Sequence, residues 1–451
     1  MITMENKQRV KTIAVIFIIA IVLISLITEF LYIFNNKYTY NKLQPEKGVL
    51  TLSQEEIDSN PFHFLIKDWE FYEDALLTPT YFKNQTSLPN MKYVSIGDTE
   101  SSYTSQTKNN TFIGTYRMKI NFPEKEGFYA LEMPQVYSAY ELYINDKLYL
   151  KVGDTHNYKA QIQNRCTFFT ASGETYITIA VKDASGIKAG ITSPPTLGKP
   201  YSINITRAFK FLINNFIMTL IFFGALFSLI LAISGKSNYS YMFFFMCLIY
   251  AVYLNHPLIN LCFSMGGNFS YIFEYFCTHF VYLMVIMLQN RLCNLNKNVS
   301  SISEICGSVF CAIAFVYGVF TPYLSAPLCT FLSTLCNVFE WLAAIYLVAI
   351  GTYAVFNDIK YGRIFLFGNV CFVASLLLYI IQPLYDSIYT DQSVEIGILA
   401  ILGCLYFVYW ASIIDKYIRN MALDDERRLM ERQINLYKEN YVHITEQIEE
   451  T

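Results

Sequence analysis

Four ionisable side chains lie inside long apolar segments, where a charged or strongly polar group is costly. Glu340 lies near the middle of the apolar block Cys329–Phe356. Glu274 and His279 lie in the first half of another block, and Glu395 begins the last one. A transporter would gather such groups at a cavity near the bilayer midplane, as part of an ion or proton path. The favoured alternative is that they hydrogen-bond between helices, with Glu340 as the strongest exception.

Aromatic side chains between residues 35 and 206 could stack on sugar rings, because Trp and Tyr combine a flat apolar face with a polar edge. The candidate ligand contacts are Trp69, Tyr72, Tyr116, Tyr140 and Tyr143. Aromatic residues at every second position of a strand more often belong to the core or to cross-strand pairs. For any single residue of this set, the core is the favoured interpretation.

Motifs of catalysis and metal binding do not occur in the sequence. It contains no nucleophile elbow and no His-Glu-x-x-His zinc motif. Of its 11 cysteines, only Cys166 falls between residues 35 and 206, and the others lie in or beside apolar blocks as small buried hydrophobes. The net charge of −3 comes with no basic block that would indicate nucleic acid. We expect no cofactor, no metal and no enzymatic activity in the chain as given.

Long apolar blocks must position these residues, since 54% of the chain is hydrophobic and only 15% is charged. A bilayer core about 30 Å thick needs about 20 apolar residues of helix. Eight blocks are expected to span the membrane: Ile13–Phe34, Phe211–Ile233, Tyr239–Phe263, Tyr271–Leu288, Ile305–Phe320, Cys329–Phe356, Ile364–Tyr385 and Val394–Ile414. We interpret the first as an uncleaved anchor rather than a signal peptide, because no small-x-small cleavage site follows it.

Basic residues predict the orientation. Three of them precede the first block, and later ones border the other blocks on the same side. By the positive-inside rule, both termini are cytoplasmic and residues 35–206 are extracytoplasmic, in a multi-pass protein of the plasma membrane. Arg207 and Lys210, at the outer entrance to the second block, are a local exception.

The segment 35–206 alternates apolar and polar side chains with the period of half-buried strands. One such row is formed by Tyr116, Met118, Ile120 and Phe122. Asn145-Asp146 separates two further runs, and both residue types tolerate the positive φ of a two-residue turn, which predicts a β-hairpin. Several short strands between turns predict a β-sandwich.

The polar C-terminal segment predicts a coiled coil, because it contains no Gly or Pro after Ile414. Its apolar side chains recur at alternating spacings of four and three residues: Met430, Ile434, Tyr437, Tyr441, Ile444 and Ile448. This is an a/d seam of nearly three heptads. We expect it to form a homodimer or a heterodimer. The alternative is an amphipathic helix on its own bundle or on the membrane.

The strand segment resembles a known type of domain. Gly114–Lys119, Tyr129–Pro134 and Tyr137–Lys147 are similar to the galactose-binding-like jelly roll, with Asn-Asp in place of the usual Asn-Gly turn. Followed by seven spans, the region Trp69–Ile414 resembles the bacterial seven-transmembrane receptors with diverse intracellular signalling modules. The resemblance implies an outer jelly roll, a seven-helix bundle and a cytoplasmic output module.

The segment Glu431–Thr451 resembles the linker helix ahead of the dimerisation domain in bacterial sensor histidine kinases of the GHKL ATPase superfamily. His443 lacks the adjacent acid of the phosphoacceptor motif and is interpreted as a coil residue. No glycine follows Gly403, so the chain has no Gly-rich ATP lid. The resemblance implies a kinase or response-regulator partner, or a kinase domain if the natural chain continues past Thr451.

These patterns predict a transmembrane signalling receptor. Its expected parts are a cytoplasmic N-terminus and membrane anchor (1–34), an extracytoplasmic β-sandwich sensor domain (35–206), a seven-transmembrane bundle (207–414) and a cytoplasmic coiled-coil linker helix (415–451). The expected ligand is a carbohydrate or an envelope fragment. The alternative function is a membrane transporter, or an envelope-polysaccharide assembly protein, with a glycan-binding outer domain.

Overall fold

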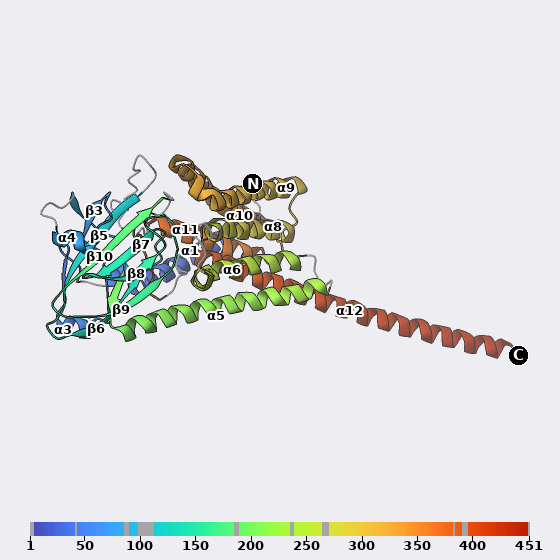
Figure 1. The fold of residues 1–451 in the computed structure, drawn as a ribbon. Coiled ribbons are helices and arrows are strands. Elements are labelled where there is room, and N and C mark those ends of the chain that lie inside the picture. Colours follow the sequence, from blue (N-terminus) through green and yellow to red (C-terminus); the bar gives the residue numbers. More distant parts are fainter. Residues whose placement is uncertain are drawn as a thin grey trace.

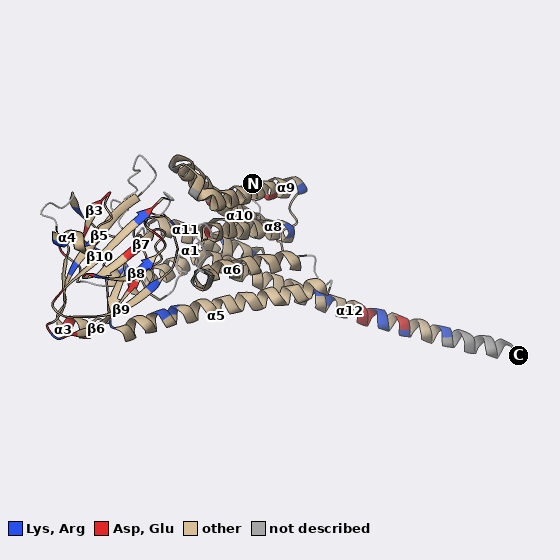
Figure 2. Cartoon of the chain, in the orientation of Figure 1, with Lys and Arg blue, Asp and Glu red and all other residues tan. Residues whose placement is uncertain are grey.

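A domain of β-strands lies at one end of a bundle of long helices, and the last helix projects from the other end (Figure 1). The computed structural model describes residues 4–40, 43–84, 90–97, 112–184, 189–234, 239–263, 270–381, 384–389 and 396–449. Charged residues gather on the β domain and on the projecting helix, and the helices between them carry few (Figure 2). The bundle is therefore the apolar middle of the molecule.

The bundle is formed by long helices. They are α1 (Met4–Phe34), α5 (Pro200–Ile233), α6 (Ser240–Phe263), the π-helical turn η1 (Ile272–Cys277) that continues into α8 (Thr278–Leu292), α9 (Lys297–Phe320), the 3₁₀ turn η2 (Thr321–Tyr323), α10 (Ala326–Phe356), α11 (Gly362–Ile381) and α12 (Ile396–Glu449). Among the described residues, seven helices are long and apolar enough to cross a membrane: α1, α5, η1 with α8, α9, α10, α11 and α12. The chain is therefore a multi-pass membrane protein. The remaining predicted span corresponds to α6, whose apolar part Ser240–His256 is shorter.

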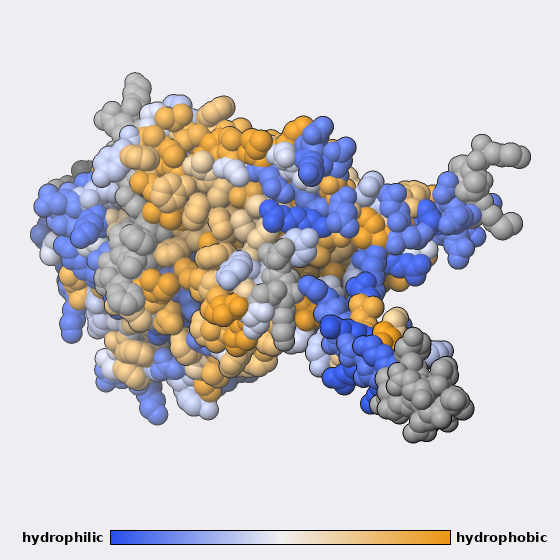
Figure 3. All heavy atoms as spheres, turned by 90° about the vertical axis from the view of Figure 1, so that its right-hand side faces the viewer, coloured by the Kyte–Doolittle hydropathy of each residue, from blue (hydrophilic) through white to orange (hydrophobic). Residues whose placement is uncertain are grey.

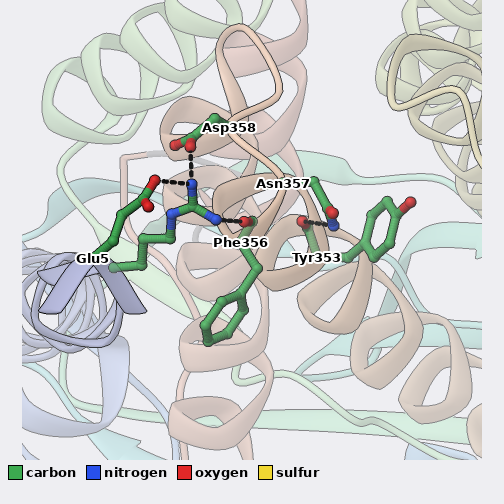
Figure 4. A network of polar contacts seen from close by, with 6 residues as sticks. Glu5, Tyr353, Phe356, Asn357 and Asp358 are labelled. Atoms are coloured by element: carbon green, nitrogen blue, oxygen red, sulfur yellow. Dashed lines mark hydrogen bonds and ion pairs between the residues drawn. The ribbon is translucent and has the colours of Figure 1, made fainter. Parts of the chain in front are cut away.

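Helix α1 is a member of the bundle, although the sequence predicted a separate anchor. Ala20 and Ile24 of α1 are buried in one cluster with Leu366 and Val370 of α11. At the start of α1, the Arg9 guanidinium contacts the carboxylates of Glu5 and Asp358 and the backbone carbonyl of Phe356, between α10 and α11 (Figure 4).

The other end of α1 is held by the segment between α11 and α12. The Asn35 side-chain oxygen accepts a hydrogen bond from the Tyr389 amide at 2.7 Å, and the Lys37 ammonium lies 2.8 Å from the Asp386 carboxylate. Asn36 and Ser387 form an isolated β-bridge. Polar contacts thus fix α1 to the bundle at both of its ends, with apolar packing between them.

The β domain is built from two sheets. Its strands are β1 (Val49–Thr51), β2 (Phe62–Phe64), β3 (Trp69–Glu73), β4 (Met91–Val94), β5 (Phe112–Asn121), β6 (Gly127–Met133), β7 (Ala139–Ile144), β8 (Lys147–Val152), β9 (Arg165–Ala171), β10 (Glu174–Asp183) and β11 (Thr196–Gly198), with the short helices α2 (Lys37–Tyr40), α3 (Gln54–Ser59) and α4 (Pro79–Asn84). A seven-stranded sheet has the order β4-β3-β5-β10-β7-β8, with β1 paired to β5, and a four-stranded sheet has the order β2-β11-β6-β9.

The predicted alternation places apolar side chains between the two sheets. Met118 and Ile120 of β5 and Leu131 and Met133 of β6 have no exposed surface and share one cluster. The predicted hairpin is confirmed, since β7 and β8 are antiparallel and Asn145 in the turn has a φ of 51°. A register shift after Leu142 pairs Leu148 with Tyr143 on the face of the sheet away from the core, and Leu148 is 44% exposed.

Close packing between helices of the bundle depends on glycine where two backbones approach each other. A Cβ atom added to Gly351 of α10 would lie 2.8 Å from the Leu366 Cα of α11, whereas one added to Gly403 of α12 would meet no atom within 4 Å. A backbone atom cannot give way as a flexible side chain can, so the two glycines should respond differently to the same substitution.

We expect Gly351→Ala to destabilise the protein by about 1–3 kcal/mol through overpacking. Gly403→Ala should be neutral or stabilising by up to about 1 kcal/mol, because alanine favours the helix. Thermal unfolding of the detergent-solubilised full chain measures both. Equal effects of the two substitutions would contradict the packing of α10 on α11.

Candidate functional site

The five aromatic candidates for ligand contact lie mostly inside the β domain. Trp69 and Tyr140 have no exposed surface and Tyr116 is 5% exposed, all within the core cluster. Tyr72 is buried beneath α4, where its ring lies 5.2 Å from that of Phe82. Tyr72 and Tyr143 lie on the other face of the sheet, where Tyr143 is only half-buried. The placement of Trp69, Tyr116 and Tyr140 agrees with the core interpretation.

A polar row crosses the face of the large sheet that is turned away from the core. Register places Tyr143, Thr178, Arg117 and Glu70 side by side on β7, β10, β5 and β3. The Arg117 guanidinium lies 4.3 Å from the centroids of two aromatic rings, those of Phe82 and Tyr176, and 3.6 Å from the Glu70 carboxylate. The candidate residues from sequence did not include Arg117. In the sequence, Arg117 stands between the apolar residues Tyr116 and Met118, and this alternation indicates that it lies on the outer face of the strand.

Glu141 lies in the neighbouring row and collects three donors. Its carboxylate accepts hydrogen bonds from the hydroxyls of Tyr143 at 2.7 Å and Thr155 at 3.2 Å, and pairs with the Lys151 ammonium at 3.1 Å. Burial opposes ionisation of Glu141, but these donors outweigh it and hold the pKa of the carboxyl below its usual value. Burial and the contact with Glu141 raise the pKa of Tyr143 to about 12, so its hydroxyl remains a donor.

Glu274 forms a contact between the β domain and the bundle. The hydroxyl of Tyr137, which lies between β6 and β7, donates a hydrogen bond to the Glu274 carboxylate in η1. The Tyr137 ring also lies 5.7 Å from the Tyr271 ring and packs on Ile162. Single π-helical turns inside helices are frequent at functional sites. The sequence suggested Glu274 but gave no sign of its partner.

The other intramembrane candidates do not form one site with Glu274. The His279 Nδ1 lies 2.8 Å from the Tyr275 carbonyl, and its Nε2 lies 3.4 Å from the Cys336 carbonyl of α10. Glu340 follows Cys336 by one helical turn and makes no hydrogen bond or ion pair with the residues that the structure describes. Glu395 lies outside the described residues. Across the described ranges, no group of three or more His, Cys, Asp or Glu side chains is placed to hold a metal ion.

A buried amide pair links three helices in the half of the bundle away from the β domain. Gln289 of α8 and Asn369 of α11 exchange two hydrogen bonds of 2.8 and 2.9 Å, and neither has exposed surface. Asn369 also donates to the Leu347 carbonyl of α10 at 2.6 Å. This pair was not among the sequence candidates, because neutral amides in an apolar block are less conspicuous than charged groups.

Helix α12 passes from the core of the bundle to solvent without a break. Leu405 and Val408 are 1% exposed in the bundle, whereas every side chain from Lys416 to Lys438 is exposed. The Asp415 carboxylate, where the helix leaves the bundle, contacts the Lys360 ammonium and the Tyr361 hydroxyl.

The predicted seam lies on the projecting part of α12. Met430 is 60%, Ile434 52% and Tyr437 76% exposed. Tyr441, Ile444 and Ile448 continue the same helix, and their side chains lie outside the described residues. Seen from this end, hydrophobic residues cover much of the bundle, and hydrophilic ones dominate the projecting helix (Figure 3).

No protein-family model and no curated protein matches the chain. Part of it is similar to glycosidase structures: a GH2 β-galacturonidase from Eisenbergiella tayi (12% identity, TM-score 0.22, 31% of this chain and 24% of that chain) and a β-glucuronidase from Faecalibacterium prausnitzii (15% identity, TM-score 0.22, 31% of each chain). The chain thus spans less than a third of the length of these enzymes. Similarity at this level carries no argument about activity.

The contact between Tyr137 and Glu274 should be a coupled pair. We expect Tyr137→Phe and Glu274→Gln each to destabilise the protein by about 1–3 kcal/mol, and the double variant to lose less than the sum. Thermal unfolding of the full chain in detergent measures this cycle. Tyr201→Phe, at a side chain that is 77% exposed, is the matched control. Strictly additive losses would show that the two side chains do not interact.

Glu141 should make the β domain sensitive to acid. Its pKa is lowered in the folded state, so its stabilising effect is complete above the unfolded pKa and is lost as the pH falls through the folded pKa. We expect Glu141→Gln to reduce the loss of melting temperature between pH 6 and about pH 3. Glu126→Gln, on an exposed turn, is the control. An unchanged pH dependence in Glu141→Gln would contradict the role given to these donors.

Proposed function

We propose that the protein is a transmembrane signalling receptor, in which the β domain senses an extracytoplasmic ligand and α12 carries the response to a cytoplasmic partner. The observation on which this rests is the continuity of α12. It is a single helix of 54 residues, and since an α-helix rises by about 1.5 Å per residue it is a rod of about 80 Å. A rotation or shift of its packed half must move its exposed half.

The packed half of α12 is closely fitted to its neighbours. The Tyr409 ring stacks 4.7 Å from that of Phe243 on α6, and its hydroxyl lies 2.7 Å from the Ser240 hydroxyl. One residue on, the Trp410 ring stacks 4.2 Å from that of Phe227 on α5. Because α5 follows directly after the last strand of the β domain, a movement of that domain has a short route to α12.

Two arrangements of the bundle would be enough for signalling, provided that the ligand prefers one of them. Asn369 is placed to take part in such a change. It holds α8 and α10 to α11, and it does so with neutral hydrogen bonds that can be exchanged for others without a net change of charge. Leu366, one turn before it on α11, is the residue against which Gly351 packs.

The proposed orientation places the β domain outside and the projecting helix in the cytoplasm. Basic residues lie at the ends of α8 and α9 that are far from the β domain (Figure 2). Arg291 and Lys297 are the residues concerned, and by the positive-inside rule this end is cytoplasmic.

The proposed relatives are the bacterial seven-transmembrane receptors with diverse intracellular signalling modules, with a jelly roll as the β domain. The proposed ligand is a carbohydrate or an envelope fragment. The proposed output is a coiled coil of two α12 helices, which would act through a kinase or response-regulator partner, as the likeness to the linker of GHKL-type histidine kinases implies.

Pairing of α12 can be tested by disulfide cross-linking in membranes, in a background where the exposed Cys262 and Cys306 are changed to Ser. We expect Met430→Cys on the seam to form dimers at least several-fold more efficiently than Arg432→Cys on the opposite side of the helix. The readout is the fraction that runs at twice the 52.1 kDa of the single chain.

Adding Ile434→Pro to the Met430→Cys variant should abolish this cross-link, since proline inside a helix costs about 3 kcal/mol. Equal cross-linking at both positions, or an efficient cross-link that survives the proline, would contradict a coiled-coil output.

Glu340 favours a second candidate function, a membrane transporter or an assembly protein for envelope polysaccharide. Its carboxylate has no partner among the described residues and it lies in the middle of α10. Transport requires that Glu340→Gln abolish movement of the substrate into vesicles, with little effect of Ile434→Pro. Signalling requires that Ile434→Pro block the output, with little effect of Glu340→Gln.

A further inference from the structure

The loop Asn357–Tyr361 joins α10 to α11 and contacts the start of α1. Its Asp358 carboxylate contacts the Arg9 guanidinium (Figure 4). Arg9 also donates to the Glu5 carboxylate at 2.7 Å and to the Phe356 carbonyl. Phe356 is the last residue of α10, where carbonyls have no partner within the helix and a cation interacts favourably with the helix dipole. Arg9 therefore fixes the start of α1 to the end of α10 and to the loop.

The other end of the loop contacts α12. The Asp415 carboxylate accepts hydrogen bonds from the Lys360 ammonium and the Tyr361 hydroxyl. The Lys360 ammonium also lies 5.2 Å from the centroid of the Tyr361 ring. Every side chain from Lys416 to Lys438 is exposed. The contact at Asp415 therefore lies at the boundary between the packed and the projecting half of α12.

The two loop residues that make these contacts have an unusual backbone conformation. Asp358 has a φ of 49° and Tyr361 a φ of 67°, both in the left-handed region. Aspartate tolerates this region, but it is rare for a bulky residue such as tyrosine. Backbone strain of this kind persists only where surrounding contacts determine it, and it is common in segments that switch between states. Contacts with Arg9 and Asp415 thus support the two strained positions, and their loss allows the loop to relax.

The ion pairs of this loop are exposed enough to be released. The side chain of Lys360 is 64% exposed and that of Asp358 is 66% exposed, whereas their partners Asp415 and Arg9 are more buried. Exposed ion pairs contribute little to stability, because water and salt weaken them. A small movement of α1 or α12 is therefore enough to break these pairs, while the apolar packing of the bundle stays intact.

Helix α1 connects this loop to the β domain. Its 31 residues form a rod of about 46 Å, at a rise of about 1.5 Å per residue. Beyond its outer end, the Tyr40 ring stacks 5.0 Å from that of Phe62 on β2. Of the described side chains within α1, Ala20 and Ile24 are buried, both in the contact with α11. A helix with so little buried side surface can shift as a unit between the contacts at its two ends.

We propose that the loop Asn357–Tyr361 is a releasable clamp on α12, and that α1 controls it through Arg9. With the clamp closed, as in the structure, Asp415 holds the projecting half of α12 in one direction. A movement of the β domain that shifts α1 withdraws Arg9 from Asp358, the loop relaxes, and Asp415 is released. The clamp is a second route from the β domain to α12, beside the one through α5. It rests on the proposed function of α12 as the output helix.

The test is the distance between two spin labels within one chain, measured by double electron–electron resonance in lipid nanodiscs. One label is placed at Lys297→Cys, at the exposed start of α9, and the other at Arg428→Cys on the projecting half of α12. The exposed Cys262 and Cys306 are changed to Ser. Labelled chains are diluted with unlabelled ones, so that distances between two chains do not contribute. The chain with its native clamp should give a single narrow distribution.

Release of the clamp should shift or broaden that distribution. We expect this result for Asp415→Ala, for Tyr361→Phe, which removes only the hydroxyl, and for Arg9→Gln on the other side of the loop. Lys83→Gln, which removes an exposed ion pair with Asp146 in the β domain, is the matched control and should leave the distribution unchanged. A melting temperature within a few degrees of that of the native chain shows that each variant is folded.

Three results would overturn the proposal: a broad distribution for the native chain, an unchanged one for Asp415→Ala or Tyr361→Phe, or an equal change in Lys83→Gln. An effect of Asp415→Ala without any effect of Arg9→Gln would overturn the control by α1. The distance lies within one chain and requires no pairing of α12. Failure of the clamp is therefore distinct from failure of the coiled-coil output, which the Met430→Cys cross-link measures.

Discussion

The unbroken backbone of α12 is the constraint on which the account of this protein depends. A sharp kink in a helix needs a disruption of its hydrogen-bond ladder, and α12 is one uninterrupted α-helix from Ile396 to Glu449. A change in the packing of α12 around Tyr409 and Trp410 therefore also moves the seam at Met430 and Ile434. The other helices of the bundle determine the position of the packed half of α12, and the exposed half moves with it.

The β domain is joined to the bundle by several kinds of contact rather than by a flexible tether. Tyr137 reaches a carboxylate in the π-helical turn, Lys37 is paired with Asp386, and α5 continues from the last strand. Because the segments that join the β domain to the bundle are short, the domain has little freedom to move without also moving α1, α5 or η1.

Sequence reasoning was most successful where a single periodicity decides the outcome. The strand alternation around Met118, the two-residue turn at Asn145 and the long apolar helices are all present, because period and turn chemistry are local properties. It was less successful for α1, whose packing on α11 depends on tertiary contacts that an apolar block does not encode. Pairs such as Tyr137 with Glu274, or Gln289 with Asn369, join positions far apart in the chain, and no pattern in one sequence reveals them. The burial of Trp69 and Tyr140 agrees with the core interpretation that the sequence favoured for them.

The most direct measurement of the central claim is the distance distribution between spin labels at Met430 of two chains in lipid nanodiscs, by double electron–electron resonance. The comparison is between the protein with its native β domain contact and Glu274→Gln, which weakens the contact at the far end of the bundle. The account predicts a defined intermolecular distance whose distribution shifts with that change. A defined distance that is identical in both proteins, or no intermolecular distance at all, would contradict the relay from the β domain to α12.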